Sequence, residues 1–245
     1  MNFNVRETPG NTDWFVHDRF GMFIHWGLYS LPARHEWVMN HERITNEDYK
    51  KYFDHFDPDL YDPKEWAAYA KKAGMKYAVL TTKHHEGFCL FDSEYTDFKA
   101  TNTKAGRDLV KEYVDAFRAE SIKIGFYYSL LDWHYPDFTT DYHHPRRDDT
   151  KEEIERFNKG RDMKRYAQYI RDQVTELLTN YGKIDLLWFD FSYVKGKDDW
   201  ESEKLIKLIR SIQPEIIINN RLGIDQVIWT PEQYQPEEWI TDDKG

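Results

Sequence analysis

The run of residues 184–191 constrains the fold most strongly, because it reads Ile-Asp-Leu-Leu-Trp-Phe-Asp-Phe. Large apolar residues in succession are typical of a strand buried on both faces, as in a parallel sheet. Gly182, just ahead of the run, is expected to end the preceding helix in the left-handed conformation. The run finishes at a carboxylate, Asp190, set among aromatic residues. An acid at the end of a buried strand indicates either a turn cap or a functional carboxylate, and the rest of the chain has to distinguish them.

Apolar strand patterns alternate with helical patterns along most of the chain. Strands are expected at residues 20–27, 77–82, 122–129, 184–191 and 216–221. Helices are expected at residues 14–19, 45–53, 62–73, 108–120 and 152–181, and around 204–209 before Pro214. The charged connection 28–60 is too long for a plain loop and is interpreted as a functional excursion. This alternation predicts an α/β fold with a parallel sheet and right-handed crossovers.

Polar residues follow the predicted strands at their carboxyl ends, one or more for each strand. They are His25, His84, Tyr127, Asp190 and Arg221. A (β/α)8 barrel brings all such ends onto one face around one pocket, whereas an open doubly wound sheet gathers only those near its switch point. We therefore predict a (β/α)8-barrel-like catalytic domain over residues 1–245. Only five or six strands can be counted before Gly245, so the barrel is expected to be incomplete at its C-terminus.

The bulk composition excludes several classes of partner. Lys and Arg number 34 against 44 Asp and Glu, a net charge of -10, which disfavours nucleic acid. The N-terminus has no apolar signal segment and no apolar run is long enough to cross a bilayer, so a cytoplasmic protein without a membrane partner is expected. The single cysteine, Cys89, rules out an internal disulfide and fits a reducing compartment. Aromatic residues make up 17% of the chain, which suits a core of rings or a sugar site.

The residues at the strand ends are compatible with three kinds of chemistry. A carboxylate, imidazoles, a guanidinium and indole rings suit a pocket for a neutral polyol. Histidine and aspartate are also metal ligands, but His84 and His85 are adjacent, and successive residues of a strand face opposite ways. Cys89 lies between Phe88 and Leu90, which favours a place in the core over a role as nucleophile. In this pattern His143 and His144, in the loop before residue 152, are expected to be solvated.

Six segments occur together in one order along the chain. They are Phe-Ile-His-Trp-Gly at 23–27, Glu36-Trp37, Lys-His-His-Glu-Gly-Phe at 83–88, Gly-Phe-Tyr-Tyr-Ser at 125–129, Leu-Trp-Phe-Asp at 187–190 and Asn-Asn-Arg at 219–221. Between residues 14 and 238 this series resembles the α-L-fucosidases of glycoside hydrolase family 29. The resemblance implies a retaining exo-glycosidase that removes terminal α-linked L-fucose through a covalent fucosyl-enzyme, with no cofactor and no metal.

The resemblance also implies residue roles. Asp190 would be the nucleophile. The residues around the fucose would be His25, Glu36, Trp37, His84, His85, Tyr127, Trp188 and Arg221. The chemistry fits, because retaining hydrolysis needs one ionised carboxylate and a second carboxyl about 5–5.5 Å away. The partner would be a fucosylated glycan or glycoside, and the oligomeric state is left open.

The second carboxyl is the least determined part of the resemblance. In some members of the family it lies in a Thr-x-Glu segment after the arginine strand, which here matches residues 230–232 and indicates Glu232. In others it lies in a Trp-Glu motif that would fall beyond Gly245. Glu237 and Glu238 are weaker candidates. The family's later strands and its C-terminal β-domain have no counterpart here, so a non-catalytic, fucose-binding fragment is the alternative hypothesis.

Overall fold

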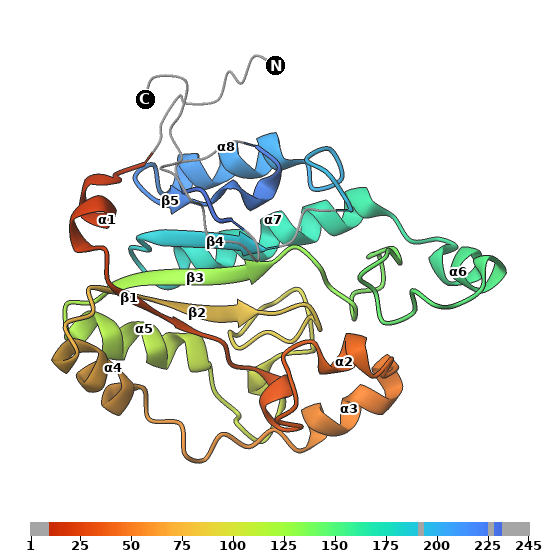
Figure 1. The fold of residues 1–245 in the computed structure, drawn as a ribbon, viewed down its shortest axis with the longest axis horizontal. Helices are drawn as coiled ribbons and strands as arrows, with labels where there is room; N and C mark the ends of the chain where they lie inside the picture. Colours follow the sequence, from red (N-terminus) through yellow and green to blue (C-terminus); the bar gives the residue numbers. More distant parts are fainter. Residues whose placement is uncertain (1–9, 191–193, 225–227, 232–245) are drawn as a thin grey trace.

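The structure is a computed structural model that describes residues 10–190, 194–224 and 228–231. Five parallel strands form one sheet in the order β1-β2-β3-β4-β5 (Figure 1). Their bounds are β1 Gly21–Ile24, β2 Tyr77–Lys83, β3 Lys123–Ser129, β4 Leu186–Asp190 and β5 Ile217–Ile218. A doubly wound sheet reverses its strand order at a switch point, whereas a barrel adds each strand beside the last. The sequential order therefore confirms a barrel-like arc, with five strands described.

Helices α4, α5, α7 and α8 flank this arc, while α2, α3 and α6 lie beyond the carboxyl ends of the strands (Figure 1). The helices are α1 Asp13–Asp18, α2 Val38–His41, α3 Asn46–Asp54, α4 Pro63–Lys72, α5 Leu109–Ala119, α6 Lys151–Asn158, α7 Met163–Thr179 and α8 Ser202–Ile212. Their starts follow from the sequence. Asp62 accepts hydrogen bonds from the backbone of Lys64 and Glu65 ahead of Pro63, and Asp108 accepts one from Lys111. A carboxylate at the N-cap satisfies backbone donors that the helix cannot pair.

The strand residues divide between two apolar clusters according to the face they occupy. Leu80, Phe126 and Leu187 join the large core between the sheet and its helices. The alternate residues belong to a second, inner cluster. Its buried members are Val79, Tyr127, Leu186, Ile217 and Ile228. Because side chains alternate along a strand, this inner cluster corresponds to the interior of a barrel.

The register aligns the carboxyl ends of the strands. Tyr127 lies opposite Trp188, and Ser129 lies opposite Asp190. The arrowheads of β2 and β3 point toward the side of the molecule that carries α2 and α3 (Figure 1). The site residues of separate strands are therefore collected at one edge, as the barrel prediction requires.

The long helix expected over residues 152–181 is two helices, α6 and α7. Gly160 separates them with φ of 86°, a left-handed conformation that costs glycine little. Each helix has its own start, because Thr150 and Glu153 form a capping box for α6 and Asp162 caps α7. The helical periodicity on both sides concealed this break.

The fifth strand is also shorter than expected. Only Ile217 and Ile218 have strand geometry, and Arg221 lies in a 3-10 turn over Asn220–Leu222. Beyond Ile218, the side chain of Asn219 makes the hydrogen bonds to β4 that a strand backbone would make. Its Oδ1 accepts a hydrogen bond from the Phe189 backbone N–H, and its Nδ2 donates one to the Phe189 carbonyl. An amide side chain offers both a donor and an acceptor, so it can take the place of a peptide unit.

His144 is buried, so the expectation of a solvated side chain is wrong. It is 3% exposed and packs against the rings of Phe138 and Phe157. Its Nδ1 accepts a hydrogen bond from the backbone N–H of Arg146. Burial, with the nearby positive charges of Arg161 and Lys195, lowers the pKa of His144 to about 3. The neighbouring His143 is only partly buried; the expectation therefore fails mainly at His144.

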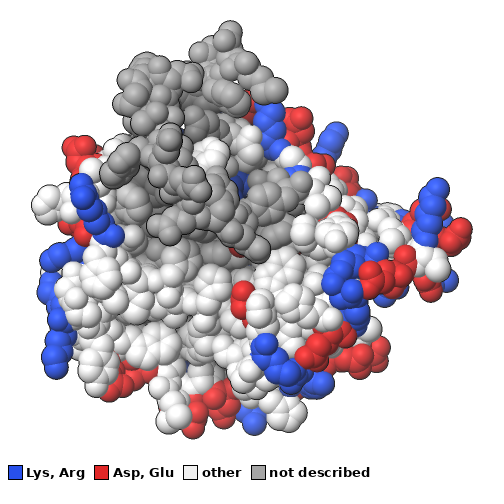
Figure 2. Space-filling model, viewed as in Figure 1, with Lys and Arg blue, Asp and Glu red and all other residues white. Residues whose placement is uncertain are grey.

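On the face shown in Figure 2, charged side chains of both signs lie mainly around the rim of the described surface, and its middle is largely uncharged. Within the described residues, no helix combines the length and apolar character that crossing a membrane requires.

Two glycines with nearly equal φ provide a matched test of the loop after β2. Gly87 has φ of 85°, and a Cβ there would lie 2.2 Å from Asp132 Oδ1; Gly74 has φ of 86° with nothing within 4 Å. We expect Gly74→Ala to cost about 1–2 kcal/mol in the free energy of unfolding, from backbone strain alone. Gly87→Ala should lower the free energy of unfolding by clearly more than Gly74→Ala. The added methyl group would displace Asp132 and disturb its buried ion pair with Lys83. Urea unfolding of both variants measures the difference, and equal losses would contradict the crowding.

The burial of His144 predicts a pH dependence of stability. The unfolded chain binds a proton at this position near pH 6.5, whereas the folded chain does so only near pH 3. Stability should therefore fall as the pH drops from 6.5 toward 3, by at most about 1.4 kcal/mol per pH unit from this group.

His144→Asn removes the titration while keeping a side-chain acceptor for the Arg146 N–H. In urea unfolding at pH 7, 6 and 5, the variant should gain on the wild type as the pH falls. A difference that is constant with pH would exclude a buried neutral His144.

Candidate active site

Asp190 lies at the carboxyl end of β4, at the centre of the residues collected by the register. Its Oδ2 accepts a hydrogen bond of 2.7 Å from the hydroxyl of Tyr127. Burial, together with the charge of Asp190, raises the pKa of the Tyr127 hydroxyl well above its usual value. The tyrosine therefore remains a donor at all ordinary pH values. The carboxylate of Asp190 is 22% exposed, so the protein holds it on one side and a reactant can reach it from the other.

Two nitrogen-bearing side chains flank this carboxylate. Arg221 Nη1 is 3.6 Å from Oδ1, and His85 Nε2 is 3.9 Å from Oδ2. The guanidinium is 7% exposed and carries a permanent positive charge. A fixed positive charge at this distance favours the ionised form of the acid. Asp190 is thus arranged as an anion with a stable orientation.

His85 has a defined pattern of hydrogen bonding. Its Nδ1 is 2.6 Å from Ser129 Oγ, and Ser129 Oγ donates to the carbonyl of Leu131 at 2.8 Å. Because serine has one hydroxyl hydrogen and a carbonyl can only accept, the hydrogen between the ring and Ser129 belongs to Nδ1. Burial lowers the pKa of His85 well below its usual value. The ring is therefore neutral, and its bare Nε2 faces the site as an acceptor.

Four rings form the wall beside Tyr127. The ring of His84 stacks on Tyr127 at 5.6 Å, and His25 lies 5.4 Å from His84 and 5.2 Å from Tyr127. Phe23 of β1 contacts Trp188 of β4 edge to face at 5.1 Å. The structure thus gathers His25, His84 and Trp188 around the tyrosine that binds Asp190, as predicted.

The long connection after β1 contributes to the opposite wall. Trp37 lies edge to face with His85 at 4.8 Å and with Trp133 at 5.5 Å. Glu36 is partly exposed, with Oε2 3.4 Å from Nδ1 of His35. Burial and the neighbouring His84 lower the pKa of His25 to about 4, and the Glu36 carboxylate partly offsets this shift. The predicted Glu36-Trp37 pair therefore lies beside the histidines, delivered by the excursion and not by a strand.

The segment that follows Arg221 is anchored to it. Arg221 Nε donates to Thr230 Oγ1 at 2.6 Å, and Nη2 donates to the Thr230 carbonyl at 3.1 Å. Asn220 Oδ1 accepts from the backbone and the hydroxyl of Thr230. The same guanidinium therefore faces Asp190 and holds the start of the Thr-Pro-Glu segment. The three candidates for the second carboxyl lie outside the described residues: Glu232, Glu237 and Glu238.

The adjacent histidines do not face opposite ways, so the argument that alternation separates them is wrong. Strand β2 ends at Lys83, and the rings of His84 and His85 lie 4.1 Å apart in the following turn. In the residues that the structure describes, no group of three or more His, Cys, Asp or Glu side chains is placed to hold a metal ion. Cys89 is fully buried, and burial raises the pKa of its thiol to about 12, which agrees with the predicted place in the core.

Sequence reasoning overlooked the residues that support the histidines. The buried pair Lys83 Nζ–Asp132 Oδ2, at 3.2 Å, links the end of β2 to the turn after β3. Trp133 N–H donates to the His85 carbonyl at 2.8 Å in the same junction. Ser129 lies in the segment 125–129, in which only Tyr127 is predicted to be a site residue. The sequence contained one signal for this pair. Lys83 ends an apolar strand, and a lysine that is buried there needs a partner of opposite charge.

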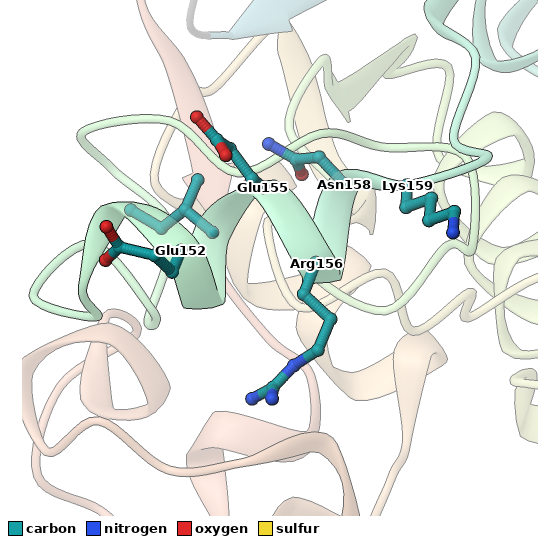
Figure 3. A pocket seen from close by; sticks show the side chains of 6 residues that line it. Glu152, Glu155, Arg156, Asn158 and Lys159 are labelled. Carbon is teal, nitrogen blue, oxygen red and sulfur yellow. The ribbon is translucent and has the colours of Figure 1, made fainter.

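A hollow of about 640 Å³ lies away from the strand ends, on the surface of α6 and the residue after it. It is lined by Glu152, Ile154, Glu155, Arg156, Asn158 and Lys159. Figure 3 shows the side chains of Glu152, Glu155, Arg156, Asn158 and Lys159 spreading from this one helix. A second hollow of about 220 Å³ lies between α3 and His144. Neither hollow is lined by a strand-end residue.

Parallel strands in sequential order, with a polar site at their carboxyl ends, define a barrel-type (β/α) domain of the kind found in enzymes. The family model described as alpha-L-fucosidase matches residues 3–244. The chain belongs to the alpha-L-fucosidase family. The fold and the family resemblance expected from the sequence are thereby confirmed.

Individual relatives agree with this assignment. The chain is 31% identical to the human tissue alpha-L-fucosidase over 230 residues, which cover 86% of this chain and 46% of the relative. It is similar to alpha-L-fucosidase isoenzyme 1 of Paenibacillus thiaminolyticus, with a TM-score of 0.83, 60% identity, and coverage of 86% and 50%.

A Bacteroides thetaiotaomicron alpha-L-fucosidase, captured as a covalent intermediate with 2-fluoro-fucosyl fluoride, is 33% identical with a TM-score of 0.74, covering 85% of this chain and 48% of its own. The chain spans about half the length of the curated relatives that it matches.

Proposed function

We propose that the chain carries the nucleophile half of a retaining exo-α-L-fucosidase site, which acts on terminal α-linked L-fucose in glycans or glycosides. The observation that carries the proposal is the partly exposed Asp190 carboxylate, held by Tyr127 and faced by Arg221 and His85. The membership of the family supports the choice of sugar. The covalent intermediate of the Bacteroides relative supports a double displacement.

In the first step, an oxygen of Asp190 attacks the anomeric carbon of fucose while the bond to the leaving oxygen breaks. The second carboxyl gives its proton to that oxygen. In the second step the same carboxyl removes a proton from water, which displaces Asp190 and restores the anomeric configuration. Tyr127 and Arg221 orient the nucleophile throughout, and the neutral His85 accepts a hydrogen bond from a sugar hydroxyl.

We propose Glu232 as the second carboxyl. It follows Thr230 by two residues, and Thr230 is bound to the guanidinium that faces Asp190. This link supports a position of the Thr-Pro-Glu segment beside the nucleophile. A competing function is fucose binding without turnover, which is considered because the chain covers only about half of the curated relatives.

The role of Asp190 is tested by substitution. Asp190→Ala should reduce release of the aryl group from an aryl α-L-fucoside by at least about 10⁴-fold, because the covalent step is lost. Asp92→Asn, at a carboxylate that is 54% exposed on the surface, should keep full activity as the matched control. Added azide should restore turnover of Asp190→Ala and yield the β-fucosyl azide. Full activity of Asp190→Ala would refute the assignment, and fucose binding without turnover by the wild type would favour the competing function.

The acid/base is tested by the leaving group. Glu232→Gln should lose most activity on a fucoside with a poor leaving group, but little in the first step on an activated aryl fucoside, because only the poor leaving group needs a proton. Glu237→Gln and Glu238→Gln serve as comparisons. If one of these two shows the selective loss instead, that residue takes the role, and if none does, the proposed position is wrong.

A further inference from the structure

Ser129, the last residue of β3, is fully buried and is hydrogen-bonded to the ring of His85. Its Oγ lies 2.6 Å from His85 Nδ1 and donates its own hydrogen to the Leu131 carbonyl at 2.8 Å. A hydroxyl that has given its hydrogen to a carbonyl can only accept from the ring, so the hydrogen of the neutral imidazole lies on Nδ1. The Nε2 atom of His85 therefore presents a lone pair.

This lone pair lies close to the nucleophile, because His85 Nε2 is 3.9 Å from Asp190 Oδ2. Two acceptors that face each other across this distance repel, whereas a hydrogen on Nε2 would be attracted to the carboxylate. The field of Asp190 alone therefore favours the other tautomer, in which His85 would donate to the nucleophile. The hydrogen bonds of Ser129 to the ring and to Leu131 oppose that preference.

The choice of tautomer matters for the nucleophile as well as for recognition. Oδ2 of Asp190 already accepts a hydrogen bond of 2.7 Å from the Tyr127 hydroxyl. A second donor on the same oxygen would stabilise the anion further before it reacts, and stabilisation of the ground state slows the attack. A hydrogen on Nε2 would also prevent His85 from accepting a hydrogen bond from a hydroxyl of the ligand.

The place of His85 is maintained by contacts that do not involve Ser129. The backbone N–H of Trp133 donates to the His85 carbonyl at 2.8 Å. The imidazole packs against the rings of Trp37 at 4.8 Å and Trp133 at 5.5 Å. Loss of the Ser129 hydroxyl should therefore change the hydrogen-bonding state of the ring more than its position.

We propose that Ser129 is a positioning residue that keeps hydrogen off Nε2 of His85, so that His85 does not donate to Asp190 and stays an acceptor for a hydroxyl of the ligand. Ser129 acts through His85 and needs no contact with the ligand itself. The nature of the ligand and the role of Asp190 as nucleophile rest on the proposed function, but the tautomer of His85 does not.

Ring-nitrogen NMR of nitrogen-15 histidine-labelled protein tests the tautomer without requiring activity. In the wild type, His85 should carry hydrogen on Nδ1 alone, and its signals are identified by their loss in His85→Ala. In Ser129→Ala the hydrogen should move to Nε2, where Asp190 attracts it. Ser93→Ala is the matched control, because it removes another fully buried hydroxyl, which donates to Glu176 at 2.7 Å, and it should leave the His85 signals unchanged.

Hydrogen on Nε2 of His85 in the wild type, or hydrogen that stays on Nδ1 in Ser129→Ala, would overturn the proposal. The wild-type spectrum is decisive by itself if Ser129→Ala does not fold.

A double-mutant cycle tests the consequence for the reaction. Ser129→Ala should lower kcat/KM for an aryl α-L-fucoside about 10- to 100-fold, whereas Ser93→Ala should keep it. In the background of His85→Ala, the further change Ser129→Ala should have little effect, because Ser129 acts through the imidazole. Equal losses in both backgrounds would reduce Ser129 to a packing role and overturn the proposal. If the wild type shows no turnover, the proposed function fails, while NMR still decides the tautomer that Ser129 sets.

Discussion

The contact between the Tyr127 hydroxyl and the Asp190 carboxylate is the interaction on which the site depends. It forms because Asp190 ends β4 and Tyr127 lies two residues before the end of the neighbouring parallel strand β3, in a register that pairs Ser129 with Asp190. A carboxylate at the end of a buried strand must be compensated, and here a donor and a permanent positive charge from Arg221 do so. The remaining partial exposure is what makes the anion useful to a substrate.

A second layer of buried polar groups determines how the first layer is presented. Ser129 fixes the tautomer of His85, and Lys83 and Asp132 join the end of β2, next to the histidines, to the turn after β3. None of these groups needs to contact a sugar. They decide which nitrogen donates and which accepts, and hydroxyl recognition depends on direction as much as on proximity.

The strands and most helices could be predicted because each rests on local information. Apolar runs identify β2, β3 and β4, and the capping aspartates Asp62 and Asp108 fix helix starts. The wrong predictions fall where one local sequence pattern is compatible with two structures. Gly160 lies between two segments with the same helical periodicity, so its break was not expected. The run that ends in Arg221 has the pattern of a strand, but at Asn219 the side chain and not the backbone makes the hydrogen bonds to β4. The polarity of His144 gave no indication of its apolar neighbours.

The sequence by itself determined the parallel α/β class and the succession of strands along the chain. It also determined which carboxylate and rings follow the strands, because side-chain polarity and periodicity are local properties. The tertiary structure alone decided which of these groups touch and in what protonation state. The proximity of His84 to His85 depends on where β2 stops, and the tautomer of His85 depends on Ser129, which is 44 residues away in the chain. Contacts between distant segments exist only once the core has packed, so no local pattern could report them.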